Sequence, residues 1–582
     1  MDPSKKTNIM TESNIYTNSI PLPDYAVNLA ILLKSNAGKF SENPIYQEVI
    51  SGTYVTLNWK QFSLHVQSIQ SWLLSNGFNP GDRLAFLSQN CQEMLELELA
   101  VMAMGAISVP IFAGYSADQA DRLLQFCNPT FAAVSDQDQF NKIESSELIK
   151  KIIHFSPIEN NGHLNLISYK DLISHTSDST DIVGLDVPAD TISLMMYTSG
   201  TMGKPKCVQL THKNILSQQA AMKALWDLNH HDRFLSYLPW HHSFGGIFEK
   251  FAAIVNGATL SLEHGYGKNI DTLLDNWEKV KPTVFFSVPR IFQEIATRVM
   301  QDRNVEKMIF HDELRFIFTA AAPLPKNIAD LFDDHGIPVV EGWGLTETSP
   351  CCTITDPAIP REQGVVGIPI PGVSIKIATD GEILVKGHNV MTGYYHNPEA
   401  TVDVMEEDGW FRTGDVGEYT DTGLKLISRK DRIFKLSNAE KVVPTEIENL
   451  IAKDCAYLAH AIMVGNGRDY PVILLFPNKN LFSQHPEGAL LSKSCKCPAG
   501  MDDYFRCLSN CLQKWNQSID TKYSRYKKAM LIDYELSIEN EELTPSMKLA
   551  PNIVGKVFKA HIESLYKPGE MKSEKVYVIN LE

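Results

Sequence analysis

The segment that most constrains this chain is a succession of strand, loop and helix signals at residues 191–228. Residues 191–197 (TISLMMY) are apolar and predict a buried strand. We expect a helix over residues 211–228 with Thr211 as its N-cap. The loop between them, YTSGTMGKPK at 197–206, supplies hydroxyls, glycines and lysines. Glycines let backbone N–H groups approach an anion, hydroxyls donate further hydrogen bonds and lysine adds charge, so the segment predicts a phosphate-binding loop.

The loop is not a Walker A motif, because two residues separate Gly200 from Gly203 where that motif has four. Taken alone, it fits a flexible polar turn equally well. With QLTHKN close behind, however, YTSGTMGKPK resembles the signature loop of the adenylate-forming (AMP-binding) enzymes, which include acyl-CoA synthetases, peptide-synthetase adenylation domains and luciferases. The resemblance implies that the phosphates of ATP are held by Thr198, Ser199, Gly200, Thr201, Gly203 and Lys204.

The second strong motif is EGWGLTE at residues 341–347, where a predicted strand ends. Its glycines and tryptophan make a tight turn suited to stacking on adenine. Thr346 can donate to a phosphate oxygen, and Glu347 is a hard oxygen ligand of the kind that Mg²⁺ takes beside nucleotide phosphates. The string resembles the family's YGxTE motif, with tryptophan in place of tyrosine. The resemblance implies a magnesium ligand at Glu347 and nucleotide contacts from Glu341, Gly342, Trp343, Gly344 and Thr346.

Two further strings extend this resemblance. TAAAPL at residues 319–324 ends a strand in small side chains, on which a flat adenine ring can lie, although the family usually has glycine here. It implies nucleotide contacts from Ala321 and Ala322. In GWFRTGD at 409–415, an aspartate after glycine is by itself a turn residue. The resemblance implies instead that the Asp415 carboxylate accepts hydrogen bonds from both ribose hydroxyls.

Beside Thr346 and Glu347, which the resemblance also makes catalytic candidates, two further candidates stand out through their surroundings. A single histidine is more often packed and hydrogen-bonded than functional. LPWHHSFGG at 238–246, however, resembles the family's LPxxH motif, and His242 fills the histidine position that lines the acyl and nucleotide sites. A lone lysine in a loop is normally solvated, but LTPSMKL at 543–549 resembles the segment that carries the catalytic lysine in the family's long-chain members, which implies that role for Lys548.

The string SRKDRIFKLS at 428–437 resembles the family's domain junction. Four consecutive charges would otherwise suggest a solvated surface segment. The resemblance implies that Arg429 contacts the ribose and that Asp431 is the hinge. The next loop, SNAEK at 437–441, departs from the family's SGGEN pattern because both glycines are replaced. In the family this loop contacts the pantetheine tunnel of the thiol substrate.

Alternating strand and helix signals predict an α/β fold with a parallel sheet. A chain of 582 residues is too long for one core. We expect a large N-terminal domain of layered α/β subdomains and a smaller, mobile α+β C-terminal domain. The expected division is a polar N-terminal segment at 1–22, an AMP-binding N-terminal domain at 23–428, a hinge at 429–432, and a C-terminal lid domain at 433–582 with an insertion at about 480–525.

The charge balance and the cysteine content limit the kinds of partner and the cellular compartment that fit this chain. The balance of 53 basic and 69 acidic residues gives −16, which argues against nucleic-acid binding. The cysteines are scattered, as is typical of a reducing cytosol, and the spacing of Cys495, Cys497, Cys507 and Cys511 matches no common zinc module, so free thiols are expected. The most apolar run, 99–114, is too short to span a bilayer. We expect a cytoplasmic protein, with peripheral membrane contact and a homodimer left open.

The resemblance covers residues 25–565 and implies a function. A fatty acid would be activated by ATP, with Mg²⁺, to acyl-AMP and transferred to coenzyme A, giving acyl-CoA, AMP and pyrophosphate. The strings VPRIF, RKDRIFKLS and LTPSMKL are shared with long-chain acyl-CoA synthetases. Three alternatives stay open: an aryl (cinnamate-like) acid–CoA ligase, an acyl-AMP ligase that loads a carrier protein, and a catalytically idle nucleotide-binding scaffold. The presence of Glu347 and Lys548 argues against the last.

The acyl chain requires an apolar tunnel. Small residues at Gly245, Gly246 and Ser287 predict room for a channel between aromatic walls. Trp240 could close that channel, which would favour cinnamate-like rings.

Overall fold

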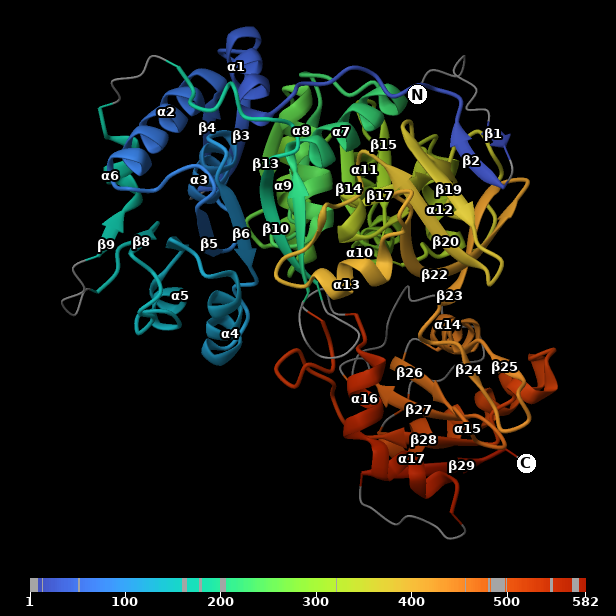
Figure 1. Ribbon diagram of the computed structural model, residues 1–582. Helices are drawn as coiled ribbons and strands as arrows, with labels where there is room; N and C mark the ends of the chain where they lie inside the picture. Colours follow the sequence, from blue (N-terminus) through green and yellow to red (C-terminus); the bar gives the residue numbers. More distant parts are fainter. Residues whose placement is uncertain are drawn as a thin grey trace.

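The computed structural model describes residues 9–12, 14–50, 53–159, 165–176, 181–198, 206–320, 322–455, 457–479, 482, 498, 500–544, 548–567 and 575–581. The chain forms a large α/β N-terminal domain and a smaller C-terminal domain, which lies below it in Figure 1. The predicted fold class is confirmed. One continuous apolar core spans the two large sheets of the N-terminal domain, joining Phe86 of the first to Phe234 and Phe286 of the second.

The first large sheet carries the predicted phosphate loop near one edge. Strands β10 to β9 run parallel, whereas β11 and β21 are antiparallel additions. Among the described residues its order is β21 (Gly393–Tyr394), β11 (Lys206–Thr211), β10 (Ile192–Thr198), β6 (Ile107–Ile111), β5 (Arg83–Leu87), β7 (Phe131–Val134), β8 (Lys151–His154) and β9 (Leu166–Ser168). Its helices are α2 (Trp59–Ser75), α3 (Gln92–Ala103), α4 (Ala117–Cys127), α5 (Gln137–Asn141) and α6 (Tyr169–Ile173).

The second large sheet is parallel at its centre, from β3 to β16. Its described order is β18 (Ile368–Pro369), β17 (Cys351–Ile354), β16 (Val339–Gly344), β15 (Phe316–Thr319), β14 (Val284–Ser287), β12 (Arg233–Ser236), β13 (Thr259–Leu262), β3 (Pro44–Ile50) and β4 (Thr53–Asn58). The helices between these strands are α8 (Lys250–Asn256), α9 (Ile270–Val280), α10 (Pro289–Gln301), α11 (Arg303–Ile309) and α12 (Lys326–Asp334). Because parallel strands end at one edge, the loops after β12, β15 and β16 meet there.

The segment after the phosphate loop differs from the expectation. A strand, β11, follows the loop and pairs antiparallel with β10, so the loop closes a hairpin instead of leading into a helix. Residues Cys207, Val208 and Leu210 of β11 are buried. Helix α7 (His212–Trp226) starts only after β11, with Thr211 as its N-cap, as predicted. Its N-terminal dipole is therefore separated from the loop by a whole strand.

The predicted polar N-terminal segment contributes structure. Strands β1 (Ile9–Glu12) and β2 (Ile15–Asn18) form a hairpin, and β2 pairs antiparallel with β19 (Val373–Ile377). They extend a third sheet that continues through β20 (Glu382–Gly387), β22 (Phe411–Thr420) and β23 (Gly423–Arg429). Figure 1 shows this hairpin beside β19, at the opposite side of the domain from α2.

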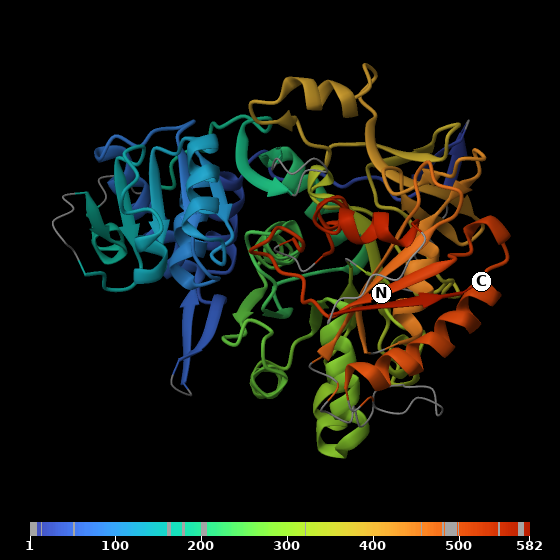
Figure 2. The ribbon, with the colours of Figure 1, turned by 90° about the horizontal axis from the view of Figure 1, so that it is seen from below.

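The C-terminal domain follows β23. Its sheet has the described order β26 (Leu458–Val464), β27 (Val472–Pro477), β28 (Lys528–Ile532) and β29 (Val576–Asn580), and a short pair, β24 (Phe434–Lys435) and β25 (Lys441–Val442), precedes it. Its helices are α14 (Pro444–Asp454), α15 (Met501–Ser518), α16 (Pro551–Val557) and α17 (Lys559–Leu565). Helix α15 lies within the expected insertion, yet it buries Leu508 and Leu512 in the domain core. Viewed from below, the domain covers one side of the N-terminal domain (Figure 2).

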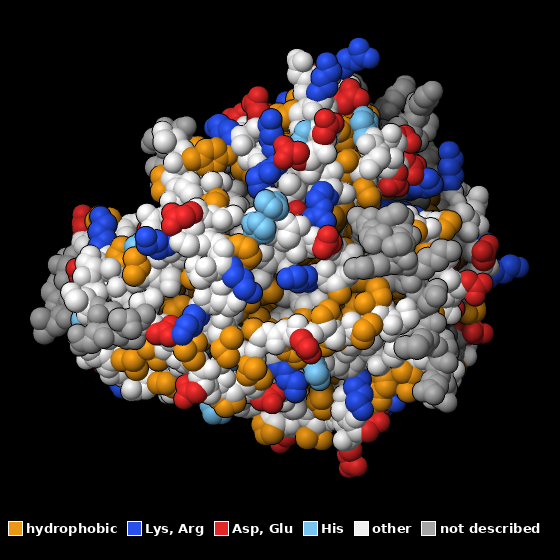
Figure 3. Space-filling view, turned by 90° about the horizontal axis from the view of Figure 1, so that it is seen from above, with side chains coloured by type: hydrophobic (Ala, Val, Ile, Leu, Met, Phe, Trp, Pro, Cys, Tyr) orange, Lys and Arg blue, Asp and Glu red, His pale blue; other side chains and the backbone are white. Residues whose placement is uncertain are grey.

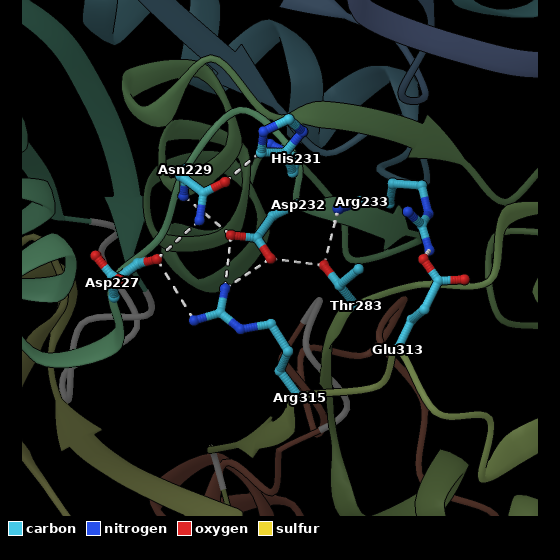
Figure 4. A pocket seen from close by; sticks show the side chains of 8 residues that line it. All are labelled: Asp227, Asn229, His231, Asp232, Arg233, Thr283, Glu313 and Arg315. Carbon is cyan, nitrogen blue, oxygen red and sulfur yellow. Dashed lines mark hydrogen bonds and ion pairs between the residues drawn. The ribbon is translucent and has the colours of Figure 1, made fainter. Parts of the chain in front are cut away.

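A polar hollow of about 500 Å³ opens at the amino ends of β12, β14 and β15 (Figure 4). Arg315 donates to both oxygens of the buried Asp232 at 2.7 and 2.8 Å, and Thr283 Oγ1 donates to Asp232 Oδ1 at 2.7 Å. These polar groups pair with one another across the hollow. They tie the amino ends of three strands together, at the end opposite to the loops that follow β12, β15 and β16.

The face turned away from the C-terminal domain mixes acidic and basic side chains with apolar ones (Figure 3). None of the helices in the described ranges combines the length and apolar character needed to cross a membrane.

Candidate active site

The meeting loops bring the predicted motifs together. His242 lies in the loop after β12, and Ala322 follows β15. Thr346 and Glu347 lie in a short 3₁₀ turn, η2 (Thr346–Thr348), after β16. A direct bond joins two of these loops, since Thr346 Oγ1 donates to Ser243 Oγ at 3.2 Å. The carboxyl edge of the second sheet therefore forms the floor of one site.

Glu347 is held at both its backbone and its side chain. Met391 N–H donates to the Glu347 carbonyl at 2.8 Å. The hydroxyl of Tyr394 donates to Glu347 Oε1, also at 2.8 Å. The Lys206 ammonium lies 4.6 Å from the centroid of the Tyr394 ring. Sequence reasoning missed Tyr394, because its partner is 47 residues away and the GYY string carries no chemical signal of its own.

Asp415 is held by two cationic or polar donors from different strands. The indole Nε1–H of Trp343 donates to Asp415 Oδ2 at 2.9 Å, and Arg429 donates to Asp415 Oδ1 at 3.0 Å. Asp415 and Arg429 face each other across β22 and β23. Gly414 has φ +71°, and a Cβ there would meet the Arg429 guanidinium at 3.1 Å, which explains the glycine. Trp343 therefore does what a phenylalanine ring could not: its N–H orients the predicted ribose carboxylate.

Replacing Trp343 with phenylalanine should raise KM for ATP about 10-fold and leave kcat within a few-fold of wild type. The aromatic face for adenine stays, but the bond to a charged carboxylate, worth roughly 1.5–3 kcal/mol, is lost. Steady-state kinetics with varied ATP measures this. The same substitution in an Asp415→Asn background is the control and should have little further effect, because the two side chains act as a unit. Additive losses would contradict the role.

His242 is poised as a neutral hydrogen-bonding group. Its Nδ1 accepts from Phe244 N–H at 3.3 Å, so the ring proton is on Nε2. Burial, and then the positive charge of Lys548, lowers the pKa of His242 to about 4. The neighbouring His241 packs against Phe112 with ring centroids 4.7 Å apart, and burial lowers its pKa to about 3. Both rings are uncharged at neutral pH.

Lys548 comes from the C-terminal domain and reaches the same place. Its ammonium is close enough to His242, Asp415 and Arg429 for their charges to interact. Surrounding protein lowers the pKa of Lys548 by desolvation, with Arg429 adding to the effect and Asp415 opposing it, although the side chain keeps access to solvent. Nearby, Arg122 of α4 pairs with Glu541 at 3.2 Å and bridges the two domains.

The predicted hinge lies in a tight turn. Lys430 N–H donates to the Gly414 carbonyl at 2.7 Å and Arg432 N–H to the Arg429 carbonyl at 3.1 Å. Asp431 lies between them, with one carboxylate oxygen 3.9 Å from Arg429 Nε. The turn is therefore tied to the N-terminal domain on one side, while Arg432 pairs with Glu448 of α14 on the other.

Backbone fills the room that was expected at the two glycines for an acyl channel. A Cβ at Gly245 would meet the Leu238 carbonyl oxygen at 2.5 Å, and one at Gly246 would meet the Trp240 carbonyl oxygen at 2.0 Å. These glycines let the 238–240 backbone pack tightly, so backbone fills the room that their missing side chains leave. Ser287 is buried and hydrogen-bonded to Tyr237 at 2.6 Å.

Gly342 and Gly344 likewise allow neighbouring groups to pack closely against the backbone. A Cβ at Gly342 would meet the Phe318 ring at 2.5 Å, and one at Gly344 would meet the Pro350 carbonyl oxygen at 1.7 Å. Glu341, just before them, accepts from Leu324 N–H at 3.2 Å and pairs with Arg361, and burial raises its pKa. It anchors the backbone at Leu324.

Thr198 ends β10, at the entry to the phosphate loop. The remaining loop residues and one adenine contact lie outside the described residues: Ser199, Gly200, Thr201, Gly203, Lys204 and Ala321. Cys495 and Cys497 also lie outside them, whereas Cys507 and Cys511 lie on α15. Within the described part of the chain, no group of histidine, cysteine or acidic side chains could hold a metal ion by itself.

Comparison with known proteins matches both parts of this chain to one enzyme family. A family model described as AMP-binding enzyme matches residues 33–395, and one for its C-terminal domain matches 431–570. The long-chain-fatty-acid–CoA ligase FadD15 of Mycobacterium bovis is 25% identical, over 93% of this chain and 97% of its own. Long-chain-fatty-acid–CoA ligase 5 of Rattus norvegicus is 27% identical, over 88% and 84%.

Solved structures share the fold. O-succinylbenzoate coenzyme A synthetase from Bacillus subtilis, in complex with AMP, has a TM-score of 0.72 at 20% identity, covering 91% of this chain and 98% of its own. An anthranilate CoA ligase in complex with anthranoyl-AMP has a TM-score of 0.74 at 18% identity, covering 94% and 99%.

Proposed function

The chain belongs to the AMP-binding enzyme family, and we propose that it joins a medium- to long-chain fatty acid to coenzyme A through an acyl-adenylate. The observation that carries the proposal is the convergence of Lys548 with Asp415, Arg429 and His242 from a different domain. A scaffold protein would have no need for a cation brought across a domain boundary to that position. The names of the fatty-acid relatives support the acyl substrate.

The chemistry explains what each residue would do. A carboxylate is a poor electrophile, so its oxygen attacks the α-phosphate of ATP and expels pyrophosphate. Negative charge gathers on the α-phosphate in that step, and positioning and cations lower the barrier. Lys548 would supply that cation, Asp415 would hold the ribose, and His242 would donate from Nε2 beside the reacting groups. The coenzyme A thiol then attacks the acyl-adenylate and releases AMP.

The donor chemistry around Glu347 fits a magnesium ion. A carboxylate and the nearby hydroxyl of Thr346 are hard oxygen donors, which Mg²⁺ takes together with substrate phosphates. When bound, Mg²⁺ would neutralise phosphate charge. The free thiols of the N-terminal domain support a cytoplasmic place of action; they are Cys91, Cys127, Cys207, Cys351 and Cys352.

A second candidate, an aryl acid–CoA ligase, has one observation in its favour. Trp240 is fully buried, and the rings of Phe244, Phe248, Phe286 and Phe318 form a cluster directly after the His242 loop. These aromatic faces are surfaces on which the ring of an aryl acid could stack.

A panel of acids from acetate to stearate, with cinnamates, tests the proposal by mass detection of the coenzyme A thioester. We expect kcat/KM to climb from butyrate to at least decanoate, since each buried methylene adds roughly 0.8 kcal/mol. A profile that peaks at cinnamate, or falls beyond hexanoate, would replace the fatty acid with the aryl acid.

A further inference from the structure

Tyr394 connects three parts of the site that are far apart in the sequence. Its hydroxyl donates to Glu347 Oε1 at 2.8 Å. Its ring lies against the Lys206 ammonium, 4.6 Å from the centroid, at the start of the strand that leaves the phosphate loop. Among the described residues, no hydrogen bond or ion pair reaches the second carboxylate oxygen, Glu347 Oε2.

The backbone fixes Tyr394 firmly. β21 pairs with β11, placing Tyr394 opposite Val208. Tyr394 N–H donates to Thr401 Oγ1 at 2.9 Å, and the side chain is 6% exposed. The ring quadrupole attracts the Lys206 cation, which helps to hold the ring in place. A rigid tyrosine therefore meets a glutamate whose own backbone is bound by Met391.

We propose that Tyr394 is a positioning residue, which orients Glu347 so that Oε2 is presented to the divalent cation that accompanies ATP. This inference rests on the proposed function, because it assigns a hydrogen-bond partner to the carboxylate that would bind the metal ion. A glutamate has three rotatable side-chain bonds, and one fixed oxygen removes most of that freedom before the cation arrives.

The test is Mn²⁺ binding, measured by electron paramagnetic resonance on the whole protein with a non-cleavable α,β-methylene analogue of ATP. Tyr394→Phe removes only the hydroxyl and should weaken Mn²⁺ binding about 10-fold. This is the lower end of the loss in metal affinity seen when a residue that is hydrogen-bonded to a metal ligand is mutated. Tyr395→Phe, at the next residue, is the matched control and should bind Mn²⁺ as the wild type does. Thermal unfolding should show all three proteins equally folded.

A thermodynamic cycle separates positioning from packing. Glu347→Gln should weaken Mn²⁺ binding by itself, and adding Tyr394→Phe to it should cause no further loss, because the hydroxyl acts only through the carboxylate. Suppose that Glu347→Gln weakens Mn²⁺ binding and Tyr394→Phe leaves it unchanged. That result would overturn this inference and leave the proposed function standing. Absence of nucleotide-dependent Mn²⁺ binding in the wild type would overturn both the metal assignment and this inference.

Discussion

Lys548→Ala should abolish acyl-adenylate formation while largely sparing thioester formation from a supplied acyl-adenylate. The cation is needed where charge gathers on the α-phosphate, and that charge develops only in the first step. Loss of one such donor costs about 10²–10³ in rate. The ammonium is close enough to His242 and Asp415 to interact with both. The other nearby cation, Arg429, is paired with Asp415, and we expect it not to replace Lys548. Pyrophosphate release and single-turnover thioester formation measure the two steps separately.

The pH dependence gives a second readout of the same side chain. Desolvation lowers the pKa of Lys548 below the ordinary 10.5, so its charge is lost at a lower pH than that of a solvated lysine. Adenylation should therefore decline on the alkaline side before 10.5 in the wild type. Lys556→Ala, at an exposed lysine of α16, is the control and should change neither step. Equal loss of both half-reactions in Lys548→Ala would remove the residue from this role.

Asp431→Pro should preserve adenylation and slow thioester formation about 100-fold, the equivalent of roughly 3 kcal/mol. The present orientation, with Lys548 near His242, suits the first step, and the second requires the C-terminal domain to turn. Proline fixes φ at the proposed pivot. In the described chain, Asp431 N–H makes no backbone hydrogen bond, so the substitution breaks none.

The control for this substitution is Asp431→Ala, which removes the carboxylate but keeps the rotation and should retain both half-reactions. Rapid-quench measurement of acyl-AMP and of acyl-CoA distinguishes the two proteins. If Asp431→Pro keeps both rates near wild type, the pivot lies at another residue.

Local sequence patterns predicted part of the secondary structure of the N-terminal domain. The apolar run at 191–197 is strand β10, and Thr211 caps α7, because buried strands and caps are properties of a few adjacent residues. The strand β11 was missed because its residues, KCVQLT, do not alternate between apolar and polar, and a strong helix signal follows them. The pairing of Thr17 with Ser374 could not be predicted, because the partner is hundreds of residues away.

The same limit applies to the site. Motif strings named Trp343, Glu347, Asp415 and Lys548, but not the bonds between them. Trp343 meets Asp415 across 72 residues and Tyr394 meets Glu347 across 47, and only the folded sheets bring them together. The glycines at 245 and 246 signal close approach, but the sequence cannot say whether a ligand or the backbone comes close.

The amino-terminal hairpin has a practical meaning for anyone shortening this chain. β2 covers one side of β19 with three paired residues, Thr17, Tyr16 and Ile15. Deleting the polar stretch before residue 22 as a dispensable tail would leave the backbone N–H and C=O groups of β19 bare at the rim of its sheet. Such a bare rim is a template for strands of other molecules, so the shortened protein would lose solubility through self-association while its catalytic groups stayed in place.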